Sequence, residues 1–278
     1  MRILITGGTG FVGKALTFHL KKQGHSVVLT TRNPNLCSAS VFLWKSVEQP
    51  FPRDALHSID AVVHLMGESL SSLRWSKKKK NAILRSRVEA TKALVEAIQC
   101  SKNPPKVFIA ASAIGIYGNR NNETLDENSA LGNDFLANVC KDWEQASIAL
   151  NETNVRRVIL RFGLVMSPLG GFEEKIRMLC KFGLTSPLGN GKQWVSTIQL
   201  ENLIALIWAA ISDTQFSGVC NAVDSCPVTN RELMRSFAKQ AHRPLLPAIP
   251  AIFIRLLLGK ASSLVLNSQR VISIRGPQ

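Results

Sequence analysis

The sequence predicts an α/β protein built on a doubly wound parallel sheet. Short apolar stretches typical of buried parallel strands, at residues 26–31, 59–67 and from 106 onwards, alternate with segments of helical periodicity. An apolar strand at residues 2–6 also runs through a glycine-rich turn directly into a helix. Strands that alternate with helices in this way pair in parallel, with helices on both faces of the sheet.

The turn after the first strand predicts a nucleotide-binding site and makes the expected fold Rossmann-type. Gly7 can take the tight turn, Gly10 lets the backbone approach a pyrophosphate, and Gly13 lets the helix pack close to the strand. The helix N-terminus favours the negative charge of the phosphates. A glycine-rich turn without a ligand is the alternative. The residues expected to contact the cofactor here are Gly7, Thr9, Gly10, Phe11, Val12 and Gly13.

The end of the second strand predicts which dinucleotide binds. Enzymes that use NAD usually carry an aspartate or glutamate there, which accepts hydrogen bonds from the adenosine ribose. This chain has Thr31 and Arg32 instead. The Arg32 guanidinium can pair with a 2′-phosphate and the Thr31 hydroxyl can donate to it, so we predict NADP(H) as the cofactor. The alternative is that Arg32 is simply a surface residue.

The strand at 59–67 predicts further cofactor contacts. Its last residues should lie at the carboxyl edge of the sheet, where ligands bind at the topological switch point. His64 is expected to be a core histidine rather than a base. The three residues expected at the edge are Leu65, Met66 and Gly67.

Two arginines are candidates for the same site. Arg87 belongs to a helix predicted at 77–99 and can reach toward the cofactor, or lie on the helix surface as a solvated cation. Arg161 follows a strand at 155–160 and can grip the cofactor or an anionic substrate, or form a structural ion pair.

Composition limits the classes of partner. The formal net charge is +15, but the basic residues are dispersed apart from the run Lys77–Lys80, which a solvated helix face explains, so we predict no nucleic-acid partner. The six cysteines form no C-x-x-C pattern or histidine cluster, which predicts no metal site. The first strand leaves no room for a signal peptide, which predicts a cytoplasmic protein. Prolines, Arg255 and Lys260 interrupt the apolar stretch 245–266, so we predict no membrane span and no membrane partner.

Several motifs together resemble the extended short-chain dehydrogenase/reductase superfamily. They are T-G-G-T-G-F-V-G at 6–13, V-V-H-L-M-G at 62–67 and S-A-I-G-I-Y-G at 112–118. Further stretches are similar to its atypical, NAD-dependent epimerase/dehydratase-like subgroup called the epimerase family: F-L-A-N-V-C-K-D-W-E at 135–144, R-F-G-L-V-M-S-P-L-G-G at 161–171 and P-L-G-N-G-K-Q-W at 187–194. The resemblance is specific for the family and not for a reaction.

The resemblance implies a Tyr-x-x-x-Lys pair, in which a tyrosinate exchanges a proton with the substrate while nicotinamide exchanges a hydride. The chain has a single tyrosine, Tyr117, and the residue four positions later is an asparagine. Aligning Glu144 with the glutamate that commonly follows the pair puts Leu136 and Cys140 at its two positions. Either Tyr117 acts with Ser112 in another geometry, or catalysis is absent.

Weaker catalytic candidates have simpler explanations. Cys140 could be a nucleophile, but a buried structural thiol is favoured because no companion histidine is evident. Asp134, Asp142 and Glu144 could supply a base, although a helix N-cap and solvated helix charges explain them as well.

The predicted organisation is an NADP(H)-binding portion at 1–160 and a mostly helical substrate lobe at 161–278. Relatives continue with another strand and helix beyond the end of this chain, so we expect the lobe to be shortened at its C-terminus. The resemblance also implies a homodimer through the helices around 77–99 and 135–150. The leading hypothesis is an NADP(H)-dependent oxidoreductase or epimerase-like enzyme acting on a small molecule. The alternative is a non-catalytic NADP(H)-binding regulator that senses redox state.

Overall fold

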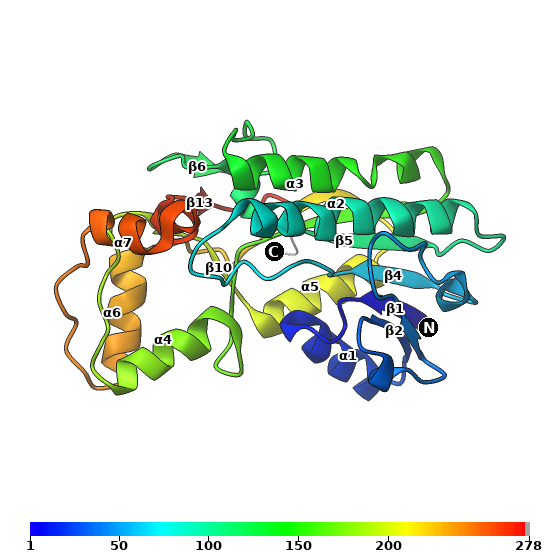
Figure 1. The fold of residues 1–278 in the computed structure, drawn as a ribbon, viewed down its shortest axis with the longest axis horizontal. Coiled ribbons are helices and arrows are strands. Elements are labelled where there is room, and N and C mark those ends of the chain that lie inside the picture. Colours follow the sequence, from blue (N-terminus) through cyan, green and yellow to red (C-terminus); the bar gives the residue numbers. More distant parts are fainter. Residues whose placement is uncertain (276–278) are drawn as a thin grey trace.

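A seven-stranded parallel sheet forms the centre of the protein (Figure 1). The computed structural model describes residues 1–275. Residues 276–278, which belong to the C-terminus at which the lobe was predicted to be shortened, lie outside the described residues. The order β11-β7-β5-β4-β1-β2-β3 reverses direction between β1 and β4, which confirms the doubly wound, Rossmann-type fold. The strands are β1 (Arg2–Thr6), β2 (Ser26–Thr31), β3 (Val41–Leu43), β4 (Ala61–His64), β5 (Val107–Ala113), β7 (Arg156–Phe162) and β11 (Gly218–Ala222).

Helices cover both faces of this sheet. In Figure 1, α1 (Phe11–Lys22) and α5 (Leu200–Ser212) lie below it, and α2 (Lys77–Gln99) and α3 (Phe135–Gln145) lie above it. Val62 and Val63 of β4 belong to different core clusters, because successive side chains of a strand point to opposite faces. Burial on both faces explains why the strands read as continuous apolar runs rather than alternating patterns.

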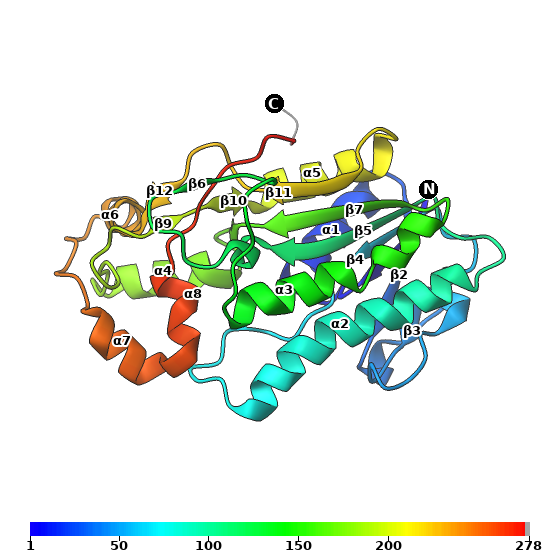
Figure 2. The same cartoon turned by 90° about the horizontal axis from the view of Figure 1, so that it is seen from above.

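The remaining helices gather at one end of the molecule, as Figure 2 shows. They are α4 (Gly171–Lys181), α6 (Asn230–Gln240), α7 (Ala251–Leu258) and α8 (Ser263–Leu266). Three short strand pairs accompany them: β8 (Leu164–Met166) with β10 (Thr197–Gln199), β9 (Trp194–Val195) with β12 (Val228–Thr229), and β6 (Thr124–Leu125) with β13 (Arg270–Val271). Short 3-10 helices lie at Pro34–Leu36, Arg53–Leu56, Ile114–Tyr117, Ile148–Glu152 and Gly259–Ser262.

The chain beyond residue 160 does not all enter this C-terminal lobe. Strand β11 pairs with β7 as the last strand of the central sheet, and α5 packs in the same core as α1. The division into a cofactor-binding portion at 1–160 and a substrate lobe at 161–278 therefore stays a prediction. Parts of the chain on both sides of residue 160 belong to the central sheet and its covering helices. Within the described part of the chain, no helix is both long and apolar enough to cross a lipid bilayer.

Two glycines of the first turn allow backbone segments to approach more closely than a side chain would permit. Gly7 has φ +75°, and a Cβ there would lie 2.8 Å from the carbonyl carbon of Leu65. A Cβ on Gly13 would lie 2.3 Å from the carbonyl oxygen of Gly7 and 2.6 Å from the Cα of Gly8. Helix α1 can therefore start this close to β1 only when position 13 is glycine.

We expect Gly13→Ala to lower the free energy of unfolding by about 1–3 kcal/mol, because the new methyl group overpacks backbone that cannot rotate away. Denaturant unfolding followed by circular dichroism measures this change. Gly115→Ala is the matched control, since a Cβ there would meet only the Leu136 Cβ at an ordinary 3.8 Å. Equal stability of the two variants would contradict the steric argument.

Candidate functional site

The N-terminus of α1 faces the carboxyl edge of the sheet at the switch point between β1 and β4. Gly10 is the N-cap residue and provides no side-chain cap, and the first turn of the helix carries no acidic residue. The N–H groups of this turn are consequently available to an anion, and the turn itself contributes no carboxylate that would repel one. Gly67 lies where the loop after β4 leaves the same edge, and a Cβ on it would be 3.1 Å from the Arg87 guanidinium carbon.

The C-terminal lobe contacts this turn through two further glycines. A Cβ on Gly170 would lie 2.7 Å from the ring of Phe11, and one on Gly171 would lie 3.2 Å from it. The aromatic ring at the start of α1 therefore packs directly against the backbone that opens α4. This contact joins the glycine-rich turn after β1 to the C-terminal lobe.

Three cations surround the Glu68 carboxylate beside the turn. Lys79 Nζ donates to Glu68 Oε1 at 2.7 Å, and Arg87 Nη1 donates to the Glu68 carbonyl oxygen at 3.1 Å. The hydrogen bond from Lys79 lowers the pKa of Glu68, and the charges of Lys79, Arg32 and Arg87 lower it further. Lys79 thus binds within the site instead of lying on a fully solvated face, as the run Lys77–Lys80 was predicted to do.

Arg87 is held by carbonyl oxygens and an aromatic ring rather than by a carboxylate. Its Nη1 donates to the carbonyl oxygens of Glu68 and Ile83, and within residues 1–275 no carboxylate lies within 4.0 Å as an ion-pair partner. Its guanidinium also lies 5.1 Å from the ring centre of Trp143. Burial lowers the pKa of Arg87. A half-buried arginine held by carbonyl oxygens and an aromatic ring is better suited to binding an anionic ligand than to being solvated by water.

His64 is a core histidine, as its position inside a buried strand predicted. Its Nδ1 lies 2.6 Å from Thr6 Oγ1, and its Nε2 lies 3.0 Å from Thr91 Oγ1. Thr91 donates its own hydrogen to the Arg87 carbonyl oxygen, so it accepts from His64, which places the ring proton on Nε2. Burial lowers the pKa of His64 to about 3, and the imidazole is neutral in the fold.

We expect His64 to make folding less stable at acidic pH. The folded pKa of about 3 lies below the ordinary 6.5, so as the pH falls below 6.5 the unfolded chain binds the proton first. The free energy of unfolding should fall through this window, down to about pH 3. Denaturant titrations at a series of pH values, for the wild type and for His64→Gln, measure the contribution. A pH dependence that is identical in the two proteins would contradict it.

A buried hydrogen-bond network joins the predicted catalytic residues to Arg161. The guanidinium donates to both oxygens of Glu144 at 2.8 Å and to the Tyr117 hydroxyl at 2.9 Å. Ser112 donates to Glu144 Oε1 at 2.7 Å. Tyr117 donates in turn to Asn221 Oδ1 at 2.8 Å, so its hydroxyl both accepts and donates within the network.

This network assigns Arg161 to the structural alternative. Burial by itself lowers the pKa of Arg161, but the hydrogen bonds and charge of Glu144 raise it above its ordinary value. All three guanidinium nitrogens donate to Glu144 or Tyr117, and the residue is buried. Arg161 therefore forms the structural ion pair that was the alternative, and its predicted contact with the cofactor stays a prediction.

The catalytic role of Ser112 and Tyr117 stays a prediction, and their geometry does not favour it. Both side chains are buried. Burial raises the pKa of Tyr117, and the Arg161 charge offsets this only in part, so a tyrosinate is disfavoured. The Ser112 hydrogen points to Glu144 rather than toward a substrate oxygen.

The two positions where the superfamily's catalytic pair would stand are apolar or inert. Leu136 packs with the cluster that contains Trp75 and Ile83. Cys140 is buried, and burial raises its pKa to about 12, with a further contribution from the Glu144 charge. Neither residue can exchange a proton near neutral pH.

Asp134, which was a candidate base, is the N-cap of α3. Its carboxylate accepts a hydrogen bond from the Ala137 amide at 2.9 Å.

Removal of the Glu144 charge should be strongly destabilising, because it leaves Arg161 buried without a counter-charge. We expect Glu144→Gln to lower the free energy of unfolding by about 3–5 kcal/mol. Glu123→Gln is the control, because Glu123 forms an ion pair with Arg120 at 2.6 Å but is half-exposed, and its loss should cost less than about 1 kcal/mol.

Urea unfolding monitored by tryptophan fluorescence measures both variants. Should Glu144→Gln fail to fold, the double variant Glu144→Leu/Arg161→Met tests the same point, since replacing both charges restores stability relative to the single variant. A small and equal effect of the two single variants would show that the buried pair is not structural.

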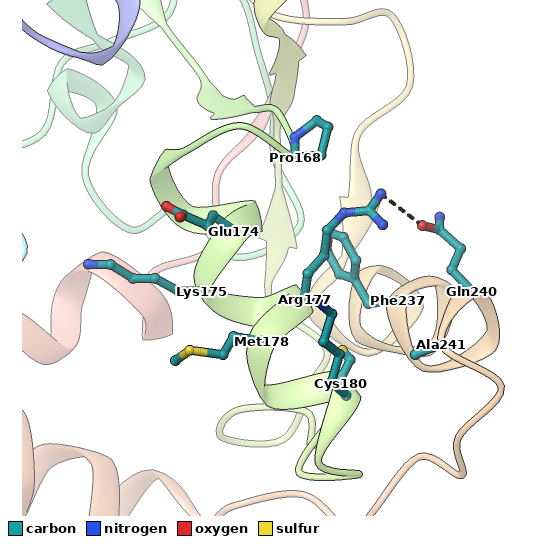
Figure 3. Close-up of a pocket in the computed structure, with 10 residues that line it drawn as sticks. Pro168, Glu174, Lys175, Arg177, Met178, Cys180, Phe237, Gln240 and Ala241 are labelled. Atoms are coloured by element: carbon teal, nitrogen blue, oxygen red, sulfur yellow. Dashed lines mark hydrogen bonds between the residues drawn. The ribbon is translucent and has the colours of Figure 1, made fainter.

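One pocket lies in the C-terminal lobe. It has a volume of about 730 Å³ and lies between α4 and α6. Figure 3 shows Arg177 extending from α4 toward Gln240 on α6, with Nη2 to Oε1 at 3.1 Å. Arg177 is also paired with Glu173 at 2.6 Å. The lining of the pocket includes the cations Lys175, Arg177 and Lys181.

The cysteines have no geometry for a shared metal. Cys37, Cys100 and Cys226 are exposed, and the other three are buried. In the part of the chain that the structure describes, no three histidine, cysteine or acidic side chains converge on a point where a metal ion could bind.

Sequence reasoning missed three features of this site. The Glu68–Lys79 pair spans a loop, and only the spacing of Lys79 on the inner face of α2 could have indicated it. The contact of Gly170 with Phe11 joins residues far apart in the sequence and left no local signal. Glu144 was considered as a base, whereas it is the acceptor for both Ser112 and Arg161.

Comparisons with known proteins agree with this geometry. A family model described as the NAD dependent epimerase/dehydratase family matches residues 3–221. The epimerase family protein YfhF of Bacillus subtilis is 34% identical over 276 residues, which cover 98% of this chain and 90% of that protein. The chloroplastic SDR39U1 homolog of Arabidopsis thaliana is 31% identical and covers 100% of this chain and 82% of that protein.

A solved structure of human epimerase family protein SDR39U1 (isoform 2) with NADPH is similar with a TM-score of 0.90 at 30% identity. The match covers 99% of this chain and 92% of the human chain. The nucleoside-diphosphate sugar epimerase of Corynebacterium glutamicum has a TM-score of 0.79 at 34% identity, and this chain spans 52% of it. The fold is therefore one that binds nicotinamide dinucleotides.

Proposed function

The chain belongs to the NAD-dependent epimerase/dehydratase family, and from that premise we propose that it is an NADP(H)-dependent oxidoreductase or epimerase-like protein that acts on a small molecule. The observation that carries the choice of cofactor is Arg32, exposed directly after β2 where an NAD enzyme would carry a carboxylate. Arg32 acts on the same carboxylate, Glu68, as Lys79 and Arg87 do. A 2′-phosphate would enter a region that is already positive.

The neighbouring residues fit this cofactor. Thr31 Oγ1 accepts from the Asn33 amide at 3.1 Å, which leaves the hydroxyl hydrogen free to donate to a phosphate. The human relative whose solved structure contains NADPH supports the same choice. In this proposal the cofactor contacts come from residues 1–160, and the substrate binds against 161–278. The contacts are Gly7, Thr9, Gly10, Phe11, Val12, Gly13, Thr31, Arg32, Leu65, Met66, Gly67 and Arg87.

The bound nicotinamide would supply hydride chemistry. The chain's own residues would bind and orient the cofactor and the substrate and would exclude water. They would not exchange a proton at the usual positions, because Leu136 and the buried thiol of Cys140 offer no exchangeable proton near neutral pH. Proton transfer to a substrate would then depend on groups of the substrate itself or on water. The homodimer through α2 and α3 and the cytoplasmic location remain predictions.

A non-catalytic NADP(H)-binding regulator is the second candidate. The observation that favours it is the commitment of the Ser112 and Tyr117 hydroxyls to the buried network around Arg161. A screen of carbonyl compounds for NADPH oxidation separates the two functions. Turnover of any substrate class favours the enzyme, and tight NADPH binding without turnover favours the regulator.

We expect calorimetric titration to show tighter binding of NADPH than of NADH. Arg32→Ala should weaken NADPH binding by about tenfold or more and leave NADH binding unchanged, because it removes a charge-assisted hydrogen bond to the 2′-phosphate alone.

Arg53→Ala is the control for this titration, since Arg53 is exposed on the short helix Arg53–Leu56. A preference for NADPH that survives in Arg32→Ala would move the specificity to Lys79 or Arg87. Failure of both dinucleotides to bind would overturn the proposed function.

A further inference from the structure

Helix α7 presents an apolar stripe to solvent. Ile252, Phe253, Leu256 and Leu257 are 70%, 61%, 71% and 61% exposed. They follow the i, i+4 spacing that places residues on one face of a helix. Ile254 is buried on the inner face, and Leu258 packs against the cluster that contains Trp75 and Ile83. The helix is therefore anchored by its inner face with its apolar outer face uncovered.

The orientation of α7 is fixed by the body of the protein. Arg74 donates to the carbonyl oxygens of Leu256 and Leu257 at 2.6 and 3.1 Å. These carbonyls lie at the C-terminal end of the helix, where no intrahelical partner exists. The outer stripe is thus held in place and cannot fold inward to bury itself.

Exposed apolar residues also lie on the segment before α7 and on the segment after α4. Backbone hydrogen bonds join Leu246 to Thr185 at 2.9 Å and Ile249 to Pro187 at 2.9 Å, so the segment before α7 runs beside the segment after α4. The exposed apolar residues on these two segments are Phe182, Leu184, Leu246 and Ile249. We call these four residues, together with Ile252, Phe253, Leu256 and Leu257, the α7 patch.

The segments that carry the α7 patch are rich in basic residues. Residues 233–275 contain seven lysines and arginines and no aspartate or glutamate, and residues 175–200 contain four lysines and arginines and no acid. Arg255 and Lys260 are exposed on and beside α7. Arg243 Nη2 donates to the Lys181 carbonyl oxygen at 3.5 Å, which places two more cations near Phe182.

We propose that the α7 patch docks on the surface of an anionic lipid membrane. Such a surface offers both an apolar layer for the stripe and negative headgroups for the flanking cations. The expectation of no membrane partner rested on the interrupted stretch 245–266, which excludes a span. A helix that lies in the interface needs no span.

The same charges argue against the patch as a contact between two copies of this chain. A symmetric dimer through α7 would bring Arg255 and Lys260 of each copy near those of the other, with no carboxylate in residues 233–275 to neutralise them. An acidic protein surface would satisfy the charges but needs an apolar groove of matching shape. The test below separates these occupants.

The experiment is flotation of the full chain with vesicles of phosphatidylcholine, alone or mixed with phosphatidylglycerol. We expect the wild type to float with the mixed vesicles and less with the neutral ones. Phe253→Asp/Leu256→Asp should reduce the bound fraction by about tenfold or more. Arg255→Gln/Lys260→Gln should remove the preference for anionic lipid. All four side chains are exposed, so thermal unfolding should show that the variants fold.

Phe18→Asp is the matched control, because Phe18 is 72% exposed on α1, away from the α7 patch. It should float like the wild type. Failure of the wild type to float, or equal flotation of Phe253→Asp/Leu256→Asp, would overturn the proposal. A dimer in solution that this double variant dissociates would assign the patch to a second copy instead, and binding of an acidic protein without binding to vesicles would assign it to a protein partner.

Discussion

The ion pair between Arg161 and Glu144 fixes the carboxyl side of the sheet. It joins β7 to α3, while Ser112 brings in β5, and Tyr117 with Asn221 extends the network to β11. Arg161 is buried and the Glu144 side chain is 14% exposed, so each charge depends on the other for compensation. The elements that would surround a substrate are consequently held by one network of hydrogen bonds instead of by separate contacts.

The same network determines what the site can do chemically. In the mechanism that the superfamily implies, a serine and a tyrosine are free to meet the substrate. Here the register of β5 and β7 sets Ser112 directly beside Arg161, and the serine donates to the carboxylate that the arginine needs. A hydroxyl used in this way stabilises the fold. In the function we propose, these two hydroxyls are therefore not free to move a proton to or from a substrate.

The sequence predicted the parts of the structure that depend on local patterns. The helix at 77–99 and the strand at 26–31 were predicted with their observed bounds, because helical periodicity and continuous apolar runs are short-range signals. His64 was correctly placed in the core on the same basis. The role of Arg161 was left open, because its partner Glu144 lies on a helix whose distance from β7 depends on the tertiary fold.

The placement of charge is not evident from the composition. The net charge is +15, and the chain contains no acidic residue after Glu232. The structure adds what a count cannot, since Lys79 pairs with Glu68 beside the glycine-rich turn while Arg255 and Lys260 flank the uncovered stripe of α7. The excess of positive charge is therefore divided between two separate surfaces.

The length of α7 limits how it can meet a membrane. Its eight residues extend about 12 Å at 1.5 Å per residue, well short of the roughly 30 Å hydrocarbon core of a bilayer. Pro250 precedes it and Gly259 follows it with φ +55°, so the helix cannot be lengthened at either end. An apolar stripe on a helix this short can be buried in lipid only if the helix lies along the surface, with the C-terminal lobe against the headgroups and the nucleotide-binding turn left free to bind its cofactor.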